Sequence, residues 1–311
     1  MSKDRRPPDE GRLIQLVYYA YVVASAVARM LPERVAYGAS ELGGRAAARF
    51  SKKRDQVRRN LVRITGEEPA SERIEHLLVA SYVSYARYWL ETFRLVREQR
   101  DFFLERFRCR DEEWIDKVCA RGKGAIVVIG HLGNWDAAGA WVGARGHRLV
   151  TVVEMLKPRR MFEFFAEHRA RLGMEIYPAR PGAIEYLCNA VEEGAIVAIL
   201  GDRDLKGRGP EVDFFGEKTT FPAGPASIAL RTGTPLLVAG VYSARLDDGR
   251  RGWRAEISPP IELPEERGPR AVQRLTQEVA RQLEHFVALH PEEWHVFQPF
   301  WLTDRKPRAQ S

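Results

Sequence analysis

The stretch Gly124–Asp136, with the sequence GAIVVIGHLGNWD, joins a short apolar run to a polar, glycine-flanked turn. The run Ala125–Ile129 is rich in β-branched residues, which is typical of a buried strand in a parallel sheet. Asn134 is a residue type that caps helices, so a helix is expected to begin directly after it. His131 therefore lies at the carboxyl end of a strand, where open α/β sheets bind their ligands.

Helical and strand patterns alternate along the rest of the chain. Helices are predicted over 71–96, 110–120, 135–144, 158–172, 182–192, 224–232 and 269–290, and strands over 147–153, 174–177, 195–200, 235–242 and 253–257, with an irregular loop over 214–221. This alternation predicts an α/β fold with a mostly parallel central sheet and helices on both faces.

The 311-residue chain carries 49 Lys and Arg against 42 Asp and Glu, a formal net charge of +7. A basic balance indicates an anionic partner such as a phospholipid headgroup or a phosphorylated carrier. Zinc-finger spacings, RNA-recognition signatures and basic runs interleaved with aromatics are missing, which argues against nucleic acid. The odd count of three cysteines, without metal-ligand spacing, fits a reducing compartment.

The sequence predicts a disordered lead-in over residues 1–11, a single domain over 12–304 and a tail over 305–311. Residues 12–30 are apolar but shorter than the roughly 20 apolar residues of a membrane span, and their tyrosines argue against a cleaved signal peptide. Two alternatives remain, a helix on a membrane surface and a helix packed on the main domain. The basic residues downstream favour the first alternative for 12–60; they are Arg45, Arg49, Lys52, Lys53, Arg54, Arg58 and Arg59.

The spacing of His131 and Asp136 does not place both on one helix face, but an aspartate in the first helical turn can fold back to an imidazole before the helix. A carboxylate on one ring nitrogen leaves the other free as a general base. Two alternatives remain. Asp136 could only stabilise the N-terminus of the helix, and His131 could only make structural hydrogen bonds. Since the chain has no G-x-S-x-G motif, the hydroxyl activated by His131 is expected to belong to a substrate, as in acyl transfer.

A second polar cluster, Gly201–Asp204, follows the predicted strand 195–200 and is expected to face the same crevice. Asp202 or Asp204 is a candidate to orient an acceptor hydroxyl, and Arg203 to bind a carboxylate or developing negative charge. An internal salt-bridge cluster is the alternative. Glu154 ends the strand 147–153 and is a third candidate by the same geometry.

Arginines flank the Phe-rich helix expected over 158–172; they are Arg159, Arg160, Arg169 and Arg171. Arginine beside Phe162, Phe164 and Phe165 suits an acyl chain on a phosphate-bearing carrier. A helix that packs its Phe residues on the core and exposes its Arg residues to solvent explains the pattern equally well.

The H-x-x-x-x-D motif of His131 and Asp136 resembles the bacterial lipid A biosynthesis acyltransferase family. Four further segments resemble its actinobacterial branch, the phosphatidylinositol mannoside acyltransferases; they are DRDL at 202–205, EVDFFGE at 211–217, PAGPA at 222–226 and HPEEWHVFQP at 290–299. The resemblance extends from about Arg12 to Asp304. It implies a glycerolipid-acyltransferase-like α/β fold.

The resemblance also implies transfer of a palmitoyl-type group from acyl-coenzyme A to a mannose hydroxyl of a phosphatidylinositol mannoside. His131 would be the general base and Asp136 its charge-relay partner. Asp202 would face the acceptor, although the branch often has Glu there, and Glu154 and Arg169 would line the same groove. We expect no metal, no cofactor and no acyl-enzyme, and a peripheral location on the cytoplasmic face of the inner membrane.

Two other functions remain open at this stage. The nearer one is the same chemistry on a lipid A precursor or another glycolipid. The farther one is a non-catalytic protein that binds anionic lipid through its basic N-terminal region.

Overall fold

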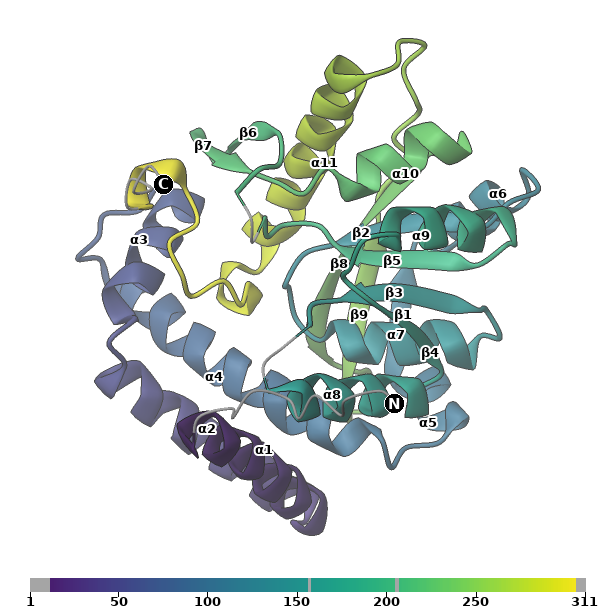
Figure 1. Ribbon diagram of the computed structural model, residues 1–311. Helices are drawn as coiled ribbons and strands as arrows, with labels where there is room; N and C mark the ends of the chain where they lie inside the picture. Colours follow the sequence, from purple (N-terminus) through teal and green to yellow (C-terminus); the bar gives the residue numbers. More distant parts are fainter. Residues whose placement is uncertain (1–11, 156–157, 205–206, 306–311) are drawn as a thin grey trace, which may run out of the picture.

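A computed structural model describes residues 12–155, 158–204 and 207–305 (Figure 1). The predicted lead-in 1–11 and the tail residues 306–311 lie outside this described part. The centre is a seven-stranded sheet of order β1-β9-β8-β2-β5-β3-β4. Its strands are β1 (Phe107–Arg110), β2 (Ala125–Ile129), β3 (Leu149–Val153), β4 (Met174–Pro178), β5 (Ile196–Leu200), β8 (Leu236–Arg245) and β9 (Arg251–Ile257).

Most neighbouring strands of this sheet are parallel. β9 pairs antiparallel with β8, and β1 lies parallel to β9 at the edge. The strands β8, β2, β5, β3 and β4 all pair in parallel. The mostly parallel sheet predicted from the sequence is therefore confirmed.

Helices cover both faces of the sheet. After the four N-terminal helices come α5 (Arg100–Arg106), α6 (Glu113–Cys119), α7 (Trp135–Ala144), α8 (Arg159–Arg171), α9 (Ala183–Glu192), α10 (Gly224–Thr232) and α11 (Pro269–Leu289), with short 3-10 turns at Pro291–Glu293 and Leu302–Asp304. Successive β2 residues point to opposite faces. Val128 joins the core beneath α9, α10 and α11, and Val127 joins the core beneath α6 and α7. Both faces are buried, which explains the unbroken apolar run of β2.

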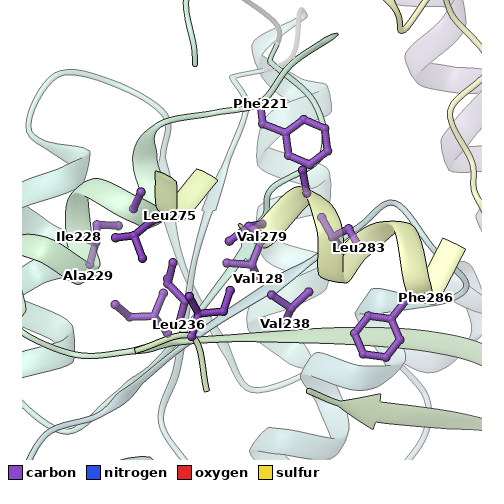
Figure 2. Close-up of a cluster of buried hydrophobic side chains, with 14 of the residues drawn as sticks. Val128, Phe221, Ile228, Ala229, Leu236, Val238, Leu275, Val279, Leu283 and Phe286 are labelled. Carbon is purple, nitrogen blue, oxygen red and sulfur yellow. The ribbon is translucent and has the colours of Figure 1, made fainter. Parts of the chain in front are cut away.

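The long helix α11 shows how one of these cores is built (Figure 2). Its buried residues Leu275, Val279 and Leu283 recur every four positions and so form one stripe. This stripe lies over Val128 and Val238 of the central strands.

The N-terminal helices α1 (Arg12–Met30), α2 (Glu33–Phe50), α3 (Arg54–Thr65) and α4 (Glu72–Leu95) lie beside the sheet (Figure 1). Ser71 caps α4, as its hydroxyl accepts the Ile74 N–H at 3.2 Å. α2 packs closely along α4, since a Cβ at Gly44 would lie 2.6 Å from the Val83 Cα. In the described part of the chain, no helix combines the length and apolar content needed to cross a membrane.

Two predicted elements are wrong. The segment expected as a loop over 214–221 is mostly a hairpin of β6 (Glu211–Phe214) and β7 (Glu217–Thr220). Its turn residues Phe215 and Gly216 both have positive φ, 50° and 75°, which is the geometry of a tight hairpin turn without its usual Asn-Gly signature.

The second error is the helix expected over 110–120. Strand β1 occupies its start, and α6 begins only at Glu113. Asp111, with a φ of 60°, separates the two elements because a residue in the left-handed region cannot continue either one. The sequence reasoning also missed the short helix α5.

Candidate active site

The turn between β2 and α7 presents His131 at the carboxyl end of the sheet. Asn134 caps α7 as predicted, because its Oδ1 accepts the Ala137 N–H at 3.0 Å. Gly133 has a φ of 59°, and a Cβ there would lie 2.2 Å from the Val241 carbonyl oxygen. Only glycine fits at this position, so the turn holds His131 in a defined place.

Asp202 is the carboxylate that binds the His131 ring. Nδ1 of His131 donates to Oδ1 at 2.6 Å, and the His131 backbone N–H donates to Oδ2 at 2.8 Å. Strand register explains the contact. Ile129 of β2 pairs with Leu200 of β5, and His131 and Asp202 each follow two residues after these paired positions. Trp294 adds a hydrogen bond from its indole N–H to Oδ2 at 2.9 Å.

These contacts determine the protonation pattern of the pair. Asp202 is 1% exposed. Burial alone would raise its pKa, but the charge and hydrogen bonds of His131, with the Trp294 indole, lower the pKa below its usual value. An ionised carboxylate only accepts hydrogen bonds, so Nδ1 is the ring nitrogen that carries a proton toward Asp202. This leaves Nε2 as the ring nitrogen that faces away from the carboxylate.

The structure corrects the predicted pairing of His131 with Asp136. The Asp136 carboxylate instead accepts from Arg169 Nε at 2.6 Å and from the Tyr88 hydroxyl at 3.2 Å. Asp136 lies in the first turn of α7, where its side chain meets α4 and α8. Burial lowers the pKa of Arg169, but the charge of Asp136, together with Tyr88 and the hydrogen bonds to both, raises the pKa overall. Asp136 and Arg169 thus form a buried ion pair.

The predicted role of Asp202 also changes. The resemblance predicts that Asp202 faces an acceptor hydroxyl, but its buried carboxylate binds His131 and Trp294. It fills the position beside the imidazole that the sequence reasoning gave to Asp136.

A cavity of about 1060 Å³ opens beside His131. Its polar lining includes Asp136, Glu154, Arg169 and Arg203, so four of the predicted residues share this space with His131. Asp204 has a different contact, since its carboxylate accepts the Gly209 N–H at 2.7 Å. With its amide oxygen turned to the guanidinium, Gln298 accepts from Arg203 Nε at 2.7 Å.

Most of the cavity wall is apolar. It crosses the sheet face beneath α7, toward β1 and α6. Side chains that line it include Ile129, Trp141, Val142, Val241, Ala255 and Ile257, with Cys109 and Ile115 on β1 and α6. The volume slightly exceeds the roughly 300–1,000 Å³ of most small-molecule sites. The arrangement thus joins a base to a long apolar space.

His295 is a site residue to which the sequence reasoning gave no role. Its backbone N–H donates to the His131 carbonyl at 2.7 Å, and its Nε2 lies 3.0 Å from the Ser84 hydroxyl. Burial, together with the charges of Arg87 and His131, lowers the pKa of His295 to about 3, so its ring is neutral. The available signal was the HPEEWH segment at 290–295, which carries the family resemblance but does not itself reveal this contact.

Within residues 12–155, 158–204 and 207–305, no group of three or more His, Cys, Asp or Glu side chains is placed to hold a metal ion.

The acyltransferase family of the chain is shown by its similarity to known sequences. The profile of the bacterial lipid A biosynthesis acyltransferases matches residues 9–303, and the chain belongs to this family. It is 36% identical over 291 residues to a phosphatidylinositol mannoside acyltransferase of Mycobacterium tuberculosis, covering 92% of this chain and 89% of that protein. It is 34% identical to the protein of that name from Mycolicibacterium smegmatis, covering 98% and 96%.

A solved structure is also similar to this chain. It is the 1-acyl-sn-glycerophosphate acyltransferase PlsC from Thermotoga maritima, which matches with a TM-score of 0.39 at 13% identity and covers 81% of this chain and 97% of that one.

Proposed function

We propose that the protein transfers a palmitoyl-type acyl group from acyl-coenzyme A to a mannose hydroxyl of a phosphatidylinositol mannoside. The observation that carries the proposal is the His131–Asp202 pair at the edge of a large apolar cavity. The names of the two mycobacterial relatives support the acceptor. The apolar wall supports a fatty acyl donor.

The chemistry follows from the protonation pattern of the pair. Nε2 of His131 removes the proton of the mannose hydroxyl as its oxygen attacks the thioester carbonyl carbon. The C–O bond forms, the C–S bond breaks, and the coenzyme A thiolate takes the proton from Nε2. Asp202 stabilises the imidazolium formed between these steps. The attacking oxygen belongs to the substrate, so no acyl-enzyme forms.

The two ends of the acyl donor have separate environments in this proposal. The chain lies along the apolar wall, and Arg180 and Arg203 line the cavity as cations for the phosphates of coenzyme A. Glu154, which also lines the cavity, is left to meet the sugar.

The donor is tested by filling the cavity. Ala255 is buried and lines the cavity on β9, so Ala255→Phe should shorten the space for the chain. The ratio of kcat/KM for palmitoyl- over octanoyl-coenzyme A should fall about tenfold or more. The same variant with the short donor is the control. An unchanged ratio would place the chain elsewhere.

The acceptor is tested by measuring free thiol released from palmitoyl-coenzyme A with different glycolipids. Release that depends on a phosphatidylinositol mannoside, with an acylated mannose as product, supports the proposal. Release with a lipid A precursor alone would instead support that acceptor. No release with any glycolipid, together with liposome binding that survives loss of His131, would favour the non-catalytic lipid-binding alternative.

The location proposed is the cytoplasmic face of the inner membrane, with the protein bound peripherally. α1 exposes apolar side chains at Leu16, Val23 and Met30, with exposures of 64%, 60% and 78%. α2 carries exposed cations at Arg45 and Arg49, of which Arg45 is paired with Glu41. An exposed apolar helix face together with cations suits an anionic bilayer surface.

Vesicle binding tests this location. Leu16→Asp with Val23→Asp should weaken binding to vesicles containing anionic phosphatidylinositol about tenfold or more. Leu289→Asp is the control, because Leu289 is half-exposed at the end of α11, outside the N-terminal helices. Equal binding by both proteins would refute the N-terminal surface as the membrane contact.

A further inference from the structure

Glu91 of α4 is a buried carboxylate outside the proposed chemistry. It is 5% exposed and lines a small cavity of about 40 Å³, separate from the large one. Three neutral groups donate to it. Asn134 Nδ2 and Trp253 Nε1 each lie 2.9 Å from Oε2, and the Tyr37 hydroxyl lies 3.0 Å from Oε1. These bonds offset the cost of burying a carboxylate.

The contact with Asn134 connects Glu91 to the catalytic turn. Asn134 stands three residues after His131 and is 1% exposed. Its Oδ1 caps α7 through Ala137, while its Nδ2 binds Glu91, so both ends of the amide are fixed. The carboxylate therefore sets the orientation of the cap that ends the turn.

The turn is held on its other side as well. Gly133 N–H donates to the Glu293 carbonyl at 3.0 Å, and His295 N–H donates to the His131 carbonyl at 2.7 Å. Glu91 therefore holds the turn from the α4 side, while backbone hydrogen bonds to the C-terminal segment hold it from the other side. Tyr37 and Trp253 link the same carboxylate to α2 and β9.

We propose that Glu91 is a positioning residue for His131 and acts through Asn134. The inference rests on the proposed function, since it takes His131 as the base. A displacement of about 1 Å far from the reacting atoms can cost on the order of 100-fold in rate, so loosening this turn has a measurable kinetic effect.

The experiment compares Glu91→Leu, Glu91→Gln, Asn134→Ser and the double variant Glu91→Leu with Asn134→Ser. Serine keeps the helix cap but lacks the amide that Glu91 binds. Glu91→Leu and Asn134→Ser should each lower kcat about 10- to 100-fold, with KM for palmitoyl-coenzyme A within about threefold. The double variant should be no slower than the slower single variant, because both remove one contact.

Glu91→Gln is the conservative variant and should recover most of kcat, since its carbonyl oxygen still accepts from Asn134. Glu98→Gln is the control, because Glu98 lines the same small cavity beyond the end of α4. It should keep the wild-type kcat. Multiplicative losses in the double variant, or a change in KM with kcat unchanged, would overturn the proposal.

A readout without turnover separates this inference from the proposed function. The Nδ1 proton of His131 lies in a 2.6 Å hydrogen bond to Asp202, and its exchange with water is measurable by NMR. Exchange should be several-fold faster in Glu91→Leu and Asn134→Ser than in wild type and Glu98→Gln. If wild type releases no thiol but exchange responds this way, the function fails and the positioning role stands. If exchange is unchanged in both variants, the positioning role fails. If Glu91→Leu does not fold, kcat and the exchange of the Nδ1 proton are both measured on Asn134→Ser instead.

Discussion

Two buried aspartates lie on either side of the His131 turn, and they differ in what they bind. Asp202 follows β5 and binds the imidazole, while Asp136 begins α7 and binds the Arg169 guanidinium. One carboxylate therefore faces an imidazole ring, and the other faces a permanent cation. Nearness in sequence favours Asp136 as the partner of His131. The partner is instead Asp202, which follows the neighbouring strand β5.

In the proposed function the first pair transfers the proton, so the largest effect is expected at His131. His131→Ala should lower kcat about 10²- to 10⁴-fold or more, because no group replaces Nε2 as proton acceptor. The measurement is thiol release from palmitoyl-coenzyme A with acceptor present, and the thermal unfolding midpoint checks the fold. Substantial remaining activity in a folded variant would remove His131 from the mechanism.

Asp202→Asn should have the next largest effect, with kcat lower about 100-fold or more. The amide keeps the shape of the side chain but no longer stabilises an imidazolium or fixes the proton on Nδ1. Steady-state kinetics across pH measure the change. If Asp136→Asn lowered kcat much more than Asp202→Asn did, the assignment of the two aspartates would have to be reversed.

Asp136→Ala should act mainly on stability. It leaves the Arg169 guanidinium buried without its partner, and breaking such a pair costs about 3–5 kcal/mol of unfolding free energy. Urea unfolding measures this loss. The exposed pair of Arg45 and Glu41 provides the control, since Glu41→Ala should leave the unfolding free energy nearly unchanged. Equal losses from both variants would show that the Asp136 pair is not structural.

The smallest expected effect is a pH dependence of the unfolding free energy, caused by two buried histidines, His168 and His295. Burial is the main cause that lowers the pKa of His295 to about 3 and that of His168 to about 4. Below pH 6.5 the unfolded chain therefore binds more protons than the folded one, and stability falls as the pH decreases. Each histidine adds a slope of at most about 1.4 kcal/mol per pH unit.

Unfolding free energies between pH 7 and pH 4.5 test this dependence. His168→Gln and His295→Gln should each flatten the curve. A curve of unchanged slope in both variants would show that neither histidine is responsible.

Local patterns explain what the sequence could predict. The apolar run of β2, the Asn134 cap and the helix after it depend on neighbours in the chain, and the structure confirms each of them. The position of Asp202 at a strand end was also foreseeable. Its pairing with His131 was not, because it depends on β5 lying next to β2, and strand order leaves no mark in a single sequence.

Contacts from distant segments were the hardest to foresee. Trp294 and His295 reach the site from the end of the chain, and Glu91 reaches it from α4. Their residue types fit many roles, so composition and spacing did not select them. The Phe215-Gly216 turn was missed for a local reason, since phenylalanine rarely adopts a positive φ.

The hydrogen bond from Trp294 to Asp202 has a consequence for synthesis of the protein. A ribosome makes the chain from the N-terminus at about 5–20 residues per second, so His131 and Asp202 emerge well before their indole partner. The proposed site therefore stays incomplete in the nascent chain until the segment that carries Trp294 has been made. A chain stopped after residue 290 should bind no acyl donor productively, and a ribosome-stalled series of lengths would show activity beginning only once Trp294 and His295 have left the exit tunnel.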